Sequence, residues 1–319
     1  MNLLLSSEFA PMLEGLLPKD VEVVWLDPLG NWEGEIHDAE VYLNAGLLKS
    51  TILEKVLQAA PALRWQHTLS AGVNHLLNPS HLSRNIILTN GAGIHAIPVA
   101  EFTLGLMLDH VKRLHNLHQL QTDHEWDNSW RNGNFLRELS GATVLIIGAG
   151  SIGQAIGHRA NAFGMRVWGS RKHPEPLPSF EKVVGSSEWY TLLPEADFVV
   201  LALPLTPETK EIINADVFKA MNPTAYFINI ARGALVEEPA LIMALTEGWI
   251  AGAGLDTFAV EPLPPESPLW SLPNAFITPH ISWSSPNTRQ RTAELFLDNL
   301  HRFRHGLPLR NVVDRQVGY

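Results

Sequence analysis

The sequence contains no cysteine among its 319 residues. This absence excludes disulfide bonds, thiolate catalysis and zinc sites built from cysteine. The sequence also lacks any run that approaches the ~18 apolar residues of a membrane span. Its first eleven residues show neither the basic start nor the long apolar stretch of a signal peptide. We therefore expect a cytoplasmic protein without a membrane partner.

Positive charge is scarce as well. Lysine and arginine number 23 against 33 acidic residues, which gives a net charge of −10. Such a balance argues against a nucleic acid or an anionic membrane as the main partner. The hydrophobic fraction of 45% is ordinary for a globular chain with a sizeable core. At a prior of ~150 residues per domain, this length favours two domains.

Short β-rich runs alternate with helical stretches along the chain, a pattern typical of an α/β fold with a mainly parallel sheet. We expect helices at 50–59 and 154–163, a long apolar helix from Ile97 with Pro98 in its first turn, and a last helix from near Ser285. The polar stretch from Gln121 to Ser140 predicts an irregular arm. The predicted strands are 2–6, 21–26, 39–44, 64–69, 85–89, 143–147, 166–169, 198–203, 225–230, 251–255 and 275–277.

One glycine motif lies between a predicted strand and a predicted helix. The buried-strand run Thr143–Ile147 is followed at once by Gly148-Ala149-Gly150-Ser151-Ile152-Gly153. In such a motif the first glycine permits a tight turn, the second lets a pyrophosphate approach the backbone, and the third lets helix and strand pack closely. The motif therefore predicts a dinucleotide site; a glycine turn that only packs is the alternative. A Walker A loop is excluded, because no Gly-Lys-Ser/Thr follows.

The end of the next strand bears on the choice of cofactor. An NAD enzyme usually places an acid there to accept a hydrogen bond from the ribose 2′-hydroxyl. This chain has Ser170, Arg171 and Lys172 at that point and no carboxylate. Because these side chains can donate to a 2′-phosphate, we expect a preference for NADP(H), with NAD(H) possible. The alternative interpretation is a solvated basic turn.

Three polar residues follow three later strands. Arg232 comes just after one predicted strand, Glu261 follows the next, and His280 follows a third. Carboxyl ends of parallel strands share one edge of a sheet, which is also the edge of the glycine loop. A guanidinium can hold the carboxylate of a 2-oxo acid, a histidine can protonate the developing alkoxide, and a carboxylate can orient that histidine. Each residue alone could be structural, but their joint occurrence predicts a catalytic Arg, Glu and His set.

At this point the motifs resemble the D-isomer-specific 2-hydroxy-acid dehydrogenases, most closely the glyoxylate/hydroxypyruvate reductases. The resemblance runs from about Thr68 to Arg304 and rests on the glycine motif, 203–209, 229–233, 256–262 and 278–281. It implies a Rossmann-type doubly wound domain and a flavodoxin-like catalytic domain built from both chain ends. We place the substrate domain at 1–97 with 285–319 and the dinucleotide-binding domain at 98–284. No metal is expected.

The resemblance also assigns residues. Arg232 is implied to bind substrate, Glu261 to orient the histidine and His280 to act as acid and base, while the backbone of Ser70, Ala71 and Gly72 is implied to hold the substrate carboxylate. Asp256 looks like the acid that contacts the nicotinamide carboxamide. The expected cofactor contacts are Gly148, Gly150, Ser151, Ile152, Gly153, Ser170, Arg171, Lys172, Leu203, Pro204, Thr209, Ile230, Ala231, Asp256 and His280.

Some features depart from the family pattern or extend it. Many members have a histidine where this chain has Ala202, which leaves any contact of that histidine in doubt. Trp283 adds bulk three residues after His280, and we expect it to narrow the substrate pocket. The family usually forms homodimers through its nucleotide domains, with the helix after Pro98 and the arm after Gln121 contributing. Trp130 in that arm could close the partner's pocket, although a packing role is the stronger interpretation.

Two other functions fit the same fold. One is a cofactor-sensing binding protein that resembles the transcriptional corepressors of this family; the complete Arg, Glu and His set argues against it. The other is oxidation of a different small anion, such as formate or phosphite, whose additional site residues cannot be located in this sequence. The predicted activity is therefore reduction of small 2-oxo acids, of the glyoxylate/hydroxypyruvate type, by hydride transfer from NADPH.

Overall fold

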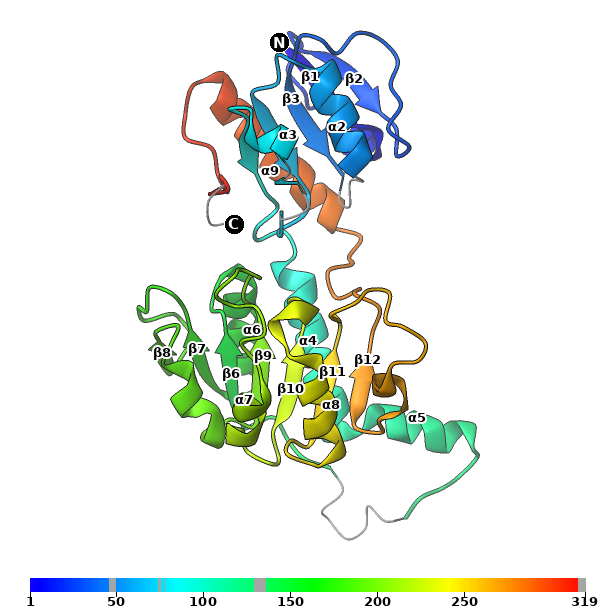
Figure 1. Cartoon of the computed structure of the whole chain (residues 1–319), viewed down its shortest axis with the longest axis vertical. Helices are drawn as coiled ribbons and strands as arrows, with labels where there is room; N and C mark the ends of the chain where they lie inside the picture. Colours follow the sequence, from blue (N-terminus) through cyan, green and yellow to red (C-terminus); the bar gives the residue numbers. More distant parts are fainter. Residues whose placement is uncertain (46–49, 74–75, 78, 129–135, 315–319) are drawn as a thin grey trace. The chain divides into compact units, whose positions relative to one another are not determined.

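The computed structural model describes residues 1–45, 50–73, 76–77, 79–128 and 136–314. Contacts between Cα atoms divide the chain into two compact units, residues 1–95 with 285–319 and residues 96–284. Each unit has its own parallel β-sheet, of five strands in the first and seven in the second (Figure 1). The predicted α/β fold with two parallel sheets is confirmed.

In the first unit, the sheet order is β2-β1-β3-β4-β5. Alternate side chains of β1 face opposite sides of this sheet, because successive residues of a strand point to opposite faces. Leu3 and Leu5 pack with Phe296 of α9, whereas Leu4 packs with Leu53 of α2. The elements are β1 (Asn2–Ser6), η1 (Ser7–Phe9), α1 (Ala10–Leu13), β2 (Glu22–Leu26), β3 (Ala39–Asn44), α2 (Ser50–Ala59), β4 (Trp65–Thr68), α3 (Pro79–Leu82), β5 (Ile87–Thr89) and α9 (Thr288–Arg304).

The second unit has a doubly wound sheet of order β12-β11-β10-β9-β6-β7-β8, all parallel. The chain runs outward from β6 to β8 in one direction and from β9 to β12 in the other. The strands β6 and β9 therefore flank the topological switch point, where such sheets bind ligands outside their carboxyl ends. The strands are β6 (Thr143–Ile147), β7 (Arg166–Ser170), β8 (Lys182–Val184), β9 (Phe198–Leu201), β10 (Tyr226–Asn229), β11 (Gly252–Leu255) and β12 (Ala275–Ile277).

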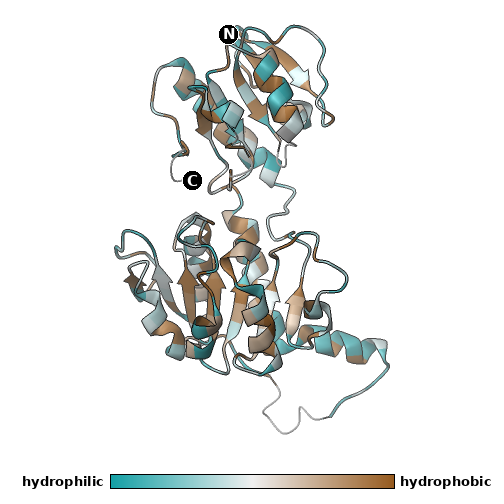
Figure 2. Ribbon diagram, in the orientation of Figure 1, coloured by the Kyte–Doolittle hydropathy of each residue, from teal (hydrophilic) through white to brown (hydrophobic). Residues whose placement is uncertain are grey.

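Helices cover both faces of this sheet, which explains why β6 reads as an unbroken apolar run. Val144 and Ile146 pack against α4 and α6, and Leu145 and Ile147 lie in the core that α7 and α8 share. Figure 2 shows the strands mostly brown, as buried apolar segments should be. The helical elements are α4 (Ala96–Lys112), α5 (Leu114–Thr122), α6 (Ser151–Ala162), η3 (Trp189–Glu195), α7 (Ala215–Ala220), η4 (Gly233–Leu235), α8 (Glu238–Thr246) and η5 (Pro268–Ser271).

The structure corrects several predicted elements. The strand β8 was not predicted, because its three residues at the sheet edge are only partly buried and carry no periodic signal. The helix α5 was not predicted either and overlaps the start of the expected arm. Its Leu114, Leu117 and Leu120 recur at helical spacing, but this stripe is short and α5 buries no residue. Figure 2 shows α5 largely in hydrophilic colours. The helix α6 begins at Ser151 rather than Gln154, since Gly150 is its N-cap.

Candidate active site

The glycine loop joins β6 to α6 at the switch point of the doubly wound sheet. Gly148 has a φ of +106°, and a Cβ there would lie 2.6 Å from the backbone of Ala202, which follows β9. A Cβ on Gly153 would lie 2.3 Å from the carbonyl oxygen of Gly148. Side chains at either position would force the two strand ends and the helix apart. Both glycines are therefore required by close packing of the backbone.

Gly150 has a different environment. A Cβ at this position would meet nothing within 4 Å, so the space in front of it is open. Gly150 is the N-cap of α6, and the amides of Ser151, Ile152 and Gly153 lie in the first turn, where helix geometry offers them no acceptor. Open space beside free amides at the positive end of a helix fits a pyrophosphate group. These residues therefore fit a dinucleotide cofactor.

The end of β7 carries the predicted 2′-phosphate contacts. Ser170 is almost fully buried, and its carbonyl oxygen accepts hydrogen bonds from the amides of Gly148 (3.1 Å) and Ala149 (2.7 Å). Arg171 Nη1 lies 2.9 Å from Glu175 Oε1 in an ion pair, and Lys172 is exposed. The strand end thus presents two cations, one of which already has a carboxylate partner.

Arg232 follows β10 on a loop that its neighbours hold rigidly. Asn229, buried at the strand end, donates from Nδ2 to Arg232 O (3.0 Å) and accepts at Oδ1 from Ala231 N (3.0 Å). A Cβ on Gly233 would lie 1.8 Å from Phe258 C, so only glycine fits there. Asn229 and Gly233 are positioning residues that sequence reasoning did not single out. The sequence feature that could have pointed to them is their position on either side of Arg232.

The guanidinium of Arg232 is largely removed from water. Burial lowers its pKa from the ordinary value, and the negative charge of Glu261 opposes that shift. Its Nη1 donates to Ala231 O at 2.6 Å, and within the described part of the chain it forms no ion pair. The remaining N–H groups of this fork can hold a carboxylate.

Glu261 and His280 form a direct hydrogen bond. His280 Nδ1 lies 2.7 Å from Glu261 Oε2, and the side chains are 36% and 35% exposed. The other oxygen of Glu261 accepts from Phe258 N at 2.9 Å, which fixes the carboxylate. Because a carboxylate accepts and does not donate, Nδ1 carries the proton and Nε2 faces outward from the pair. This is the arrangement of an oriented acid–base histidine.

Asp256 anchors the loop that carries His280. It is fully buried, and its carboxylate accepts from Thr278 Oγ1 (2.6 Å), Ile281 N (2.9 Å) and Ser282 N (3.0 Å). His280 lies between these contacts with a φ of +51°, in the left-handed region that L-residues rarely adopt. Asp256 therefore holds the Thr278 side chain before this strained residue and the backbone amides of Ile281 and Ser282 after it. This role was not predicted, and the expected contact with a nicotinamide stays a prediction.

The other predicted cofactor residues lie on the same edge of the sheet. Ile230 and Ala231 are buried after β10. The turn after β9 is folded by Thr209, whose hydroxyl donates to Pro204 O (2.8 Å) and accepts from Thr206 N (2.7 Å). Leu203 packs against the core at the start of this turn.

Trp283 follows His280 by three residues and is hydrogen-bonded to it. Its Nε1 donates to the carbonyl oxygen of His280 at 2.9 Å, and the residue is 42% exposed. The indole therefore braces the histidine loop while leaving much of its surface accessible. Trp130, the other tryptophan singled out from the sequence, lies outside the described residues.

The predicted carboxylate loop, Ser70 to Gly72, belongs to the first unit. It follows β4, and its three residues are partly buried. Ser70 N donates to Thr68 Oγ1 at 3.3 Å. Within the described residues, the amides of Ala71 and Gly72 donate to no protein acceptor. Backbone amides of this kind can bind an anion.

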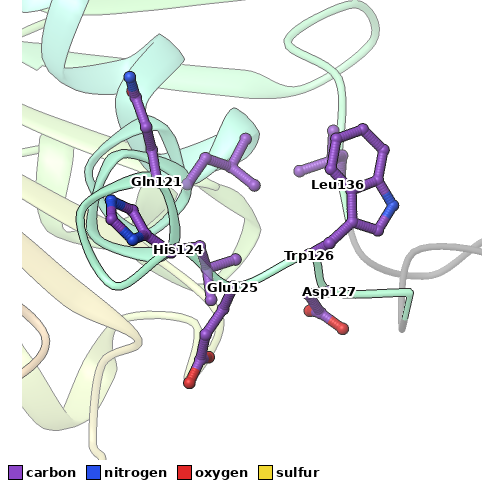
Figure 3. Close-up of a pocket in the computed structure, with 8 residues that line it drawn as sticks. Gln121, His124, Glu125, Trp126, Asp127 and Leu136 are labelled. Carbon is purple, nitrogen blue, oxygen red and sulfur yellow. The ribbon is translucent and has the colours of Figure 1, made fainter.

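A separate apolar pocket of about 560 Å³ lies beside α5, and none of the predicted site residues line it. Figure 3 shows Trp126 beside Leu136 on one side of this pocket and Gln121 with His124 on the other. Trp126 is 83% exposed. Among the described residues, no three potential ligands gather into a metal cluster, and no helix is long and apolar enough to cross a membrane.

The doubly wound sheet and its glycine loop define a dinucleotide-binding oxidoreductase scaffold. Residues 104–282 match the family described as D-isomer specific 2-hydroxyacid dehydrogenase, NAD binding domain. The glyoxylate reductase of Thermofilum pendens is 39% identical over 259 residues, which are 80% of this chain and 76% of the relative. That of Thermococcus litoralis is 35% identical over 303 residues, covering 92% and 90%.

Solved structures agree with these relatives. A D-isomer specific 2-hydroxyacid dehydrogenase of Xanthobacter autotrophicus, in complex with NADPH and MES, matches with a TM-score of 0.86 at 28% identity, covering 100% of this chain and 99% of that one. An NADPH-dependent glyoxylate/hydroxypyruvate reductase of Sinorhizobium meliloti, in complex with NADP and sulfate, has a TM-score of 0.84 at 27% identity and the same coverage. The chain belongs to the D-isomer specific 2-hydroxyacid dehydrogenase family and is an NAD(P)-dependent enzyme of that family. The predicted family is confirmed.

Proposed function

We propose that this enzyme reduces short 2-oxo acids, of the glyoxylate and hydroxypyruvate type, to 2-hydroxy acids with NADPH. The observation that carries the proposal is the 2.7 Å bond between His280 Nδ1 and Glu261 Oε2, beside an arginine without an ion pair among the described residues. A family enzyme needs one group to bind the substrate anion and another to supply a proton. Arg232 and His280 provide both.

The protein groups act on the substrate in distinct ways. Arg232 holds the carboxylate and polarises the neighbouring carbonyl oxygen with its fork of N–H donors. In the first unit, the amides of Ala71 and Gly72 are the groups that we assign to binding of a substrate carboxylate. A bound NADPH would supply the hydride that the carbonyl carbon accepts. His280 gives its Nε2 proton to the carbonyl oxygen, and Glu261 stabilises the imidazolium that donates it.

Two observations support NADPH as the preferred cofactor. The end of β7 carries Arg171 and Lys172 and no acid that would repel a 2′-phosphate. The similar proteins from Xanthobacter autotrophicus and Sinorhizobium meliloti were crystallised with NADPH and NADP. We assign cofactor binding to the second unit.

A homodimer is part of this proposal. The pocket beside α5 is lined by Leu117, Leu120 and Trp126, and Leu136 at its rim is 44% exposed. Apolar side chains exposed together mark association sites in soluble proteins. A second copy of the chain covers this surface, and sedimentation of the wild type and of Trp126→Asp measures it. A wild-type monomer at micromolar concentration contradicts the dimer.

The test of function follows absorbance at the nicotinamide band. Purified protein is mixed with glyoxylate or hydroxypyruvate and with NADPH or NADH in parallel. We expect rapid loss of NADPH and slower loss of NADH. No loss with either cofactor across a panel of 2-oxo acids overturns the proposal and favours a cofactor-sensing binding protein or another anion. A His280→Ala variant that turns over as fast as the wild type also contradicts the proposed function.

A further inference from the structure

Three successive carbonyl groups of the loop after β4 are held by one other segment of the same unit. Leu69 O lies 3.1 Å from His95 Nε2, Ser70 O accepts from Gly91 N at 3.0 Å, and Ala71 O accepts from Asn90 Nδ2 at 2.8 Å. The segment Asn90–His95 therefore fixes the orientation of three consecutive peptide planes. Because a carbonyl oxygen only accepts, His95 carries a proton on Nε2.

The fixed carbonyls determine where the amides point. In a trans peptide, the C=O of one residue and the N–H of the next point in opposite directions. With the carbonyls of Leu69, Ser70 and Ala71 turned toward Asn90–His95, the N–H groups of Ser70, Ala71 and Gly72 turn away from it. Ser70 N meets Thr68 Oγ1, whereas those of Ala71 and Gly72 have no acceptor within the described chain. Among the described residues, two neighbouring amides are thus left without a protein acceptor.

Asn90 is the residue of the segment Asn90–His95 that makes the most hydrogen bonds described here, and we call this segment the bracket. It is 6% exposed, and all its polar groups are engaged. Its Oδ1 accepts from Ala92 N (3.1 Å), its backbone amide donates to Asn311 O (3.1 Å), and Asn311 Nδ2 donates to Ala92 O (2.8 Å). The turn that presents Nδ2 to Ala71 O is thus fastened to a segment near the carboxyl end of the chain. Only the Nδ2 contact reaches the loop.

Gly91 allows the close approach. A Cβ at this position would lie 2.1 Å from Leu69 O, so any side chain would push the loop away from the bracket. The contact between the two segments is therefore made at backbone distance. Small displacements of Asn90 pass directly to the peptide planes of the loop, since no flexible side chain lies between Gly91 and Leu69.

The geometry points to Asn90, supported by His95, as a positioning residue that aims the Ala71 and Gly72 amides at the carboxylate of the substrate. The ligand is a small carboxylate, and this identity rests on the proposed function. The orientation of the amides does not, because it follows from hydrogen bonds within the unit. Asn90 itself does not touch the substrate in this scheme.

The main variants are Asn90→Asp and Asn90→Ala. Asn90→Asp keeps the oxygen that accepts from Ala92 N and replaces the donor to Ala71 O by an acceptor, and Asn90→Ala removes the donor without adding charge. We expect both to raise KM for glyoxylate about threefold to tenfold, the effect of one hydrogen bond. The kcat and the Kd for NADPH should stay within about twofold of wild type. A KM raised by Asn90→Asp alone is a charge effect and overturns the proposal.

Asn222→Asp is the matched control. Asn222 also closes a turn through Oδ1, which accepts from Thr224 N at 3.0 Å, and its Nδ2 has no recorded protein partner within the described chain. The same chemical change there should leave KM unaltered. His95→Gln, which keeps a side-chain N–H, should retain KM, whereas His95→Leu should raise it. An unchanged KM in His95→Leu and Asn90→Ala contradicts the assignment.

A second measurement separates this inference from the proposed function. Oxamate, a carboxylate that is not reduced, is titrated while the amide resonances of Ala71 and Gly72 are followed by NMR. In the wild type we expect both resonances to move, and in Asn90→Ala we expect half-saturation at a severalfold higher concentration. This result stands even if no 2-oxo acid is turned over. Equal half-saturation in both proteins overturns the positioning role, whatever the activity.

Discussion

His280 Nδ1 lies 2.7 Å from Glu261 Oε2, and the same glutamate accepts a second hydrogen bond from Phe258 N. The histidine is therefore oriented by a carboxylate that is itself fixed. Its backbone φ of +51° shows that the surrounding loop holds it in an unusual conformation. Such a pair sets the tautomer of the ring before any substrate arrives.

Replacing Glu261 by Gln should lower kcat about 100-fold to 10,000-fold, because the amide no longer stabilises an imidazolium and can impose the wrong tautomer. NADPH binding, measured by fluorescence titration, should be unchanged. Glu238→Gln is the control, since Glu238 accepts from Ala259 N at 3.3 Å in the same region and, among the described residues, does not contact His280. A Glu261→Gln enzyme with the wild-type kcat would show that the hydrogen bond between Glu261 and His280 is only structural.

Asp256→Asn should impair both stability and turnover. The new amide group would face a backbone N–H where the carboxylate now accepts from Ser282 N. Losing such a buried bond costs about 1–3 kcal/mol in the free energy of unfolding, measured by urea denaturation. Thr278→Val, which removes only the hydroxyl donor to Asp256, should cost less and keep most of kcat. Equal effects of the two variants contradict the backbone clamp.

Arg171 should govern the choice of cofactor. Arg171→Glu should lower kcat/KM for NADPH relative to NADH about 10-fold to 100-fold, because a charge-assisted contact becomes a repulsion. Glu175→Gln should strengthen NADPH binding, since it releases the guanidinium from its ion pair. Arg166→Glu changes the same charge at the other end of β7 and should leave the ratio alone. Equal kcat/KM for both cofactors in the wild type would falsify the preference.

Trp283 should restrict the size of the substrate. Trp283→Ala should raise kcat/KM for a longer 2-oxo acid relative to glyoxylate, because bulk next to the catalytic loop is removed. Trp283→Phe keeps most of that bulk but loses the N–H that donates to His280 O. A shift in preference with Ala and not with Phe assigns the effect to size. If Trp283→Ala keeps the wild-type ratio of kcat/KM for the longer acid and for glyoxylate, Trp283 does not restrict substrate size.

His67 should make the first unit sensitive to acid. It is fully buried, and this burial lowers its pKa to about 3. The unfolded chain, with a histidine pKa near 6.5, binds more protons between these values, so stability present above pH ~6.5 is lost as pH falls toward 3. The slope for one proton is about 1.4 kcal/mol per pH unit.

The measurement is urea denaturation of the wild type and of His67→Gln between pH 4 and about 7. The free energy of unfolding of His67→Gln should depend less steeply on pH than that of the wild type, by the slope of up to one proton. His118→Gln, which changes an exposed histidine of α5, should keep the wild-type slope. Identical slopes in His67→Gln and wild type would show that the buried imidazole does not titrate differently in the two states.

Much of the fold could be predicted from short local patterns, namely apolar runs for buried strands and the glycine motif for a turn. Buried strands such as β1 and β6 are nearly pure apolar runs, and the glycine motif marks the turn between β6 and α6. Elements without such patterns were missed. The strand β8 is only three residues long and lies at a sheet edge. The stripe of Leu114, Leu117 and Leu120 in α5 is short and stands among polar residues, so neither element gives a strong periodic signal.

The sequence by itself determined the chemistry of this protein: the types of residue at strand ends, the absence of an acid after β7, and the family. Only the tertiary structure decided how those residues are held. Asp256 clamps the His280 loop, Asn229 and Gly233 fix Arg232, and Asn90 brackets the loop after β4. These contacts join segments as much as 26 residues apart by hydrogen bonds between a side chain and a backbone atom. Almost every residue offers a backbone N–H and a C=O, and the sequence therefore does not show which of them a given buried side chain will reach.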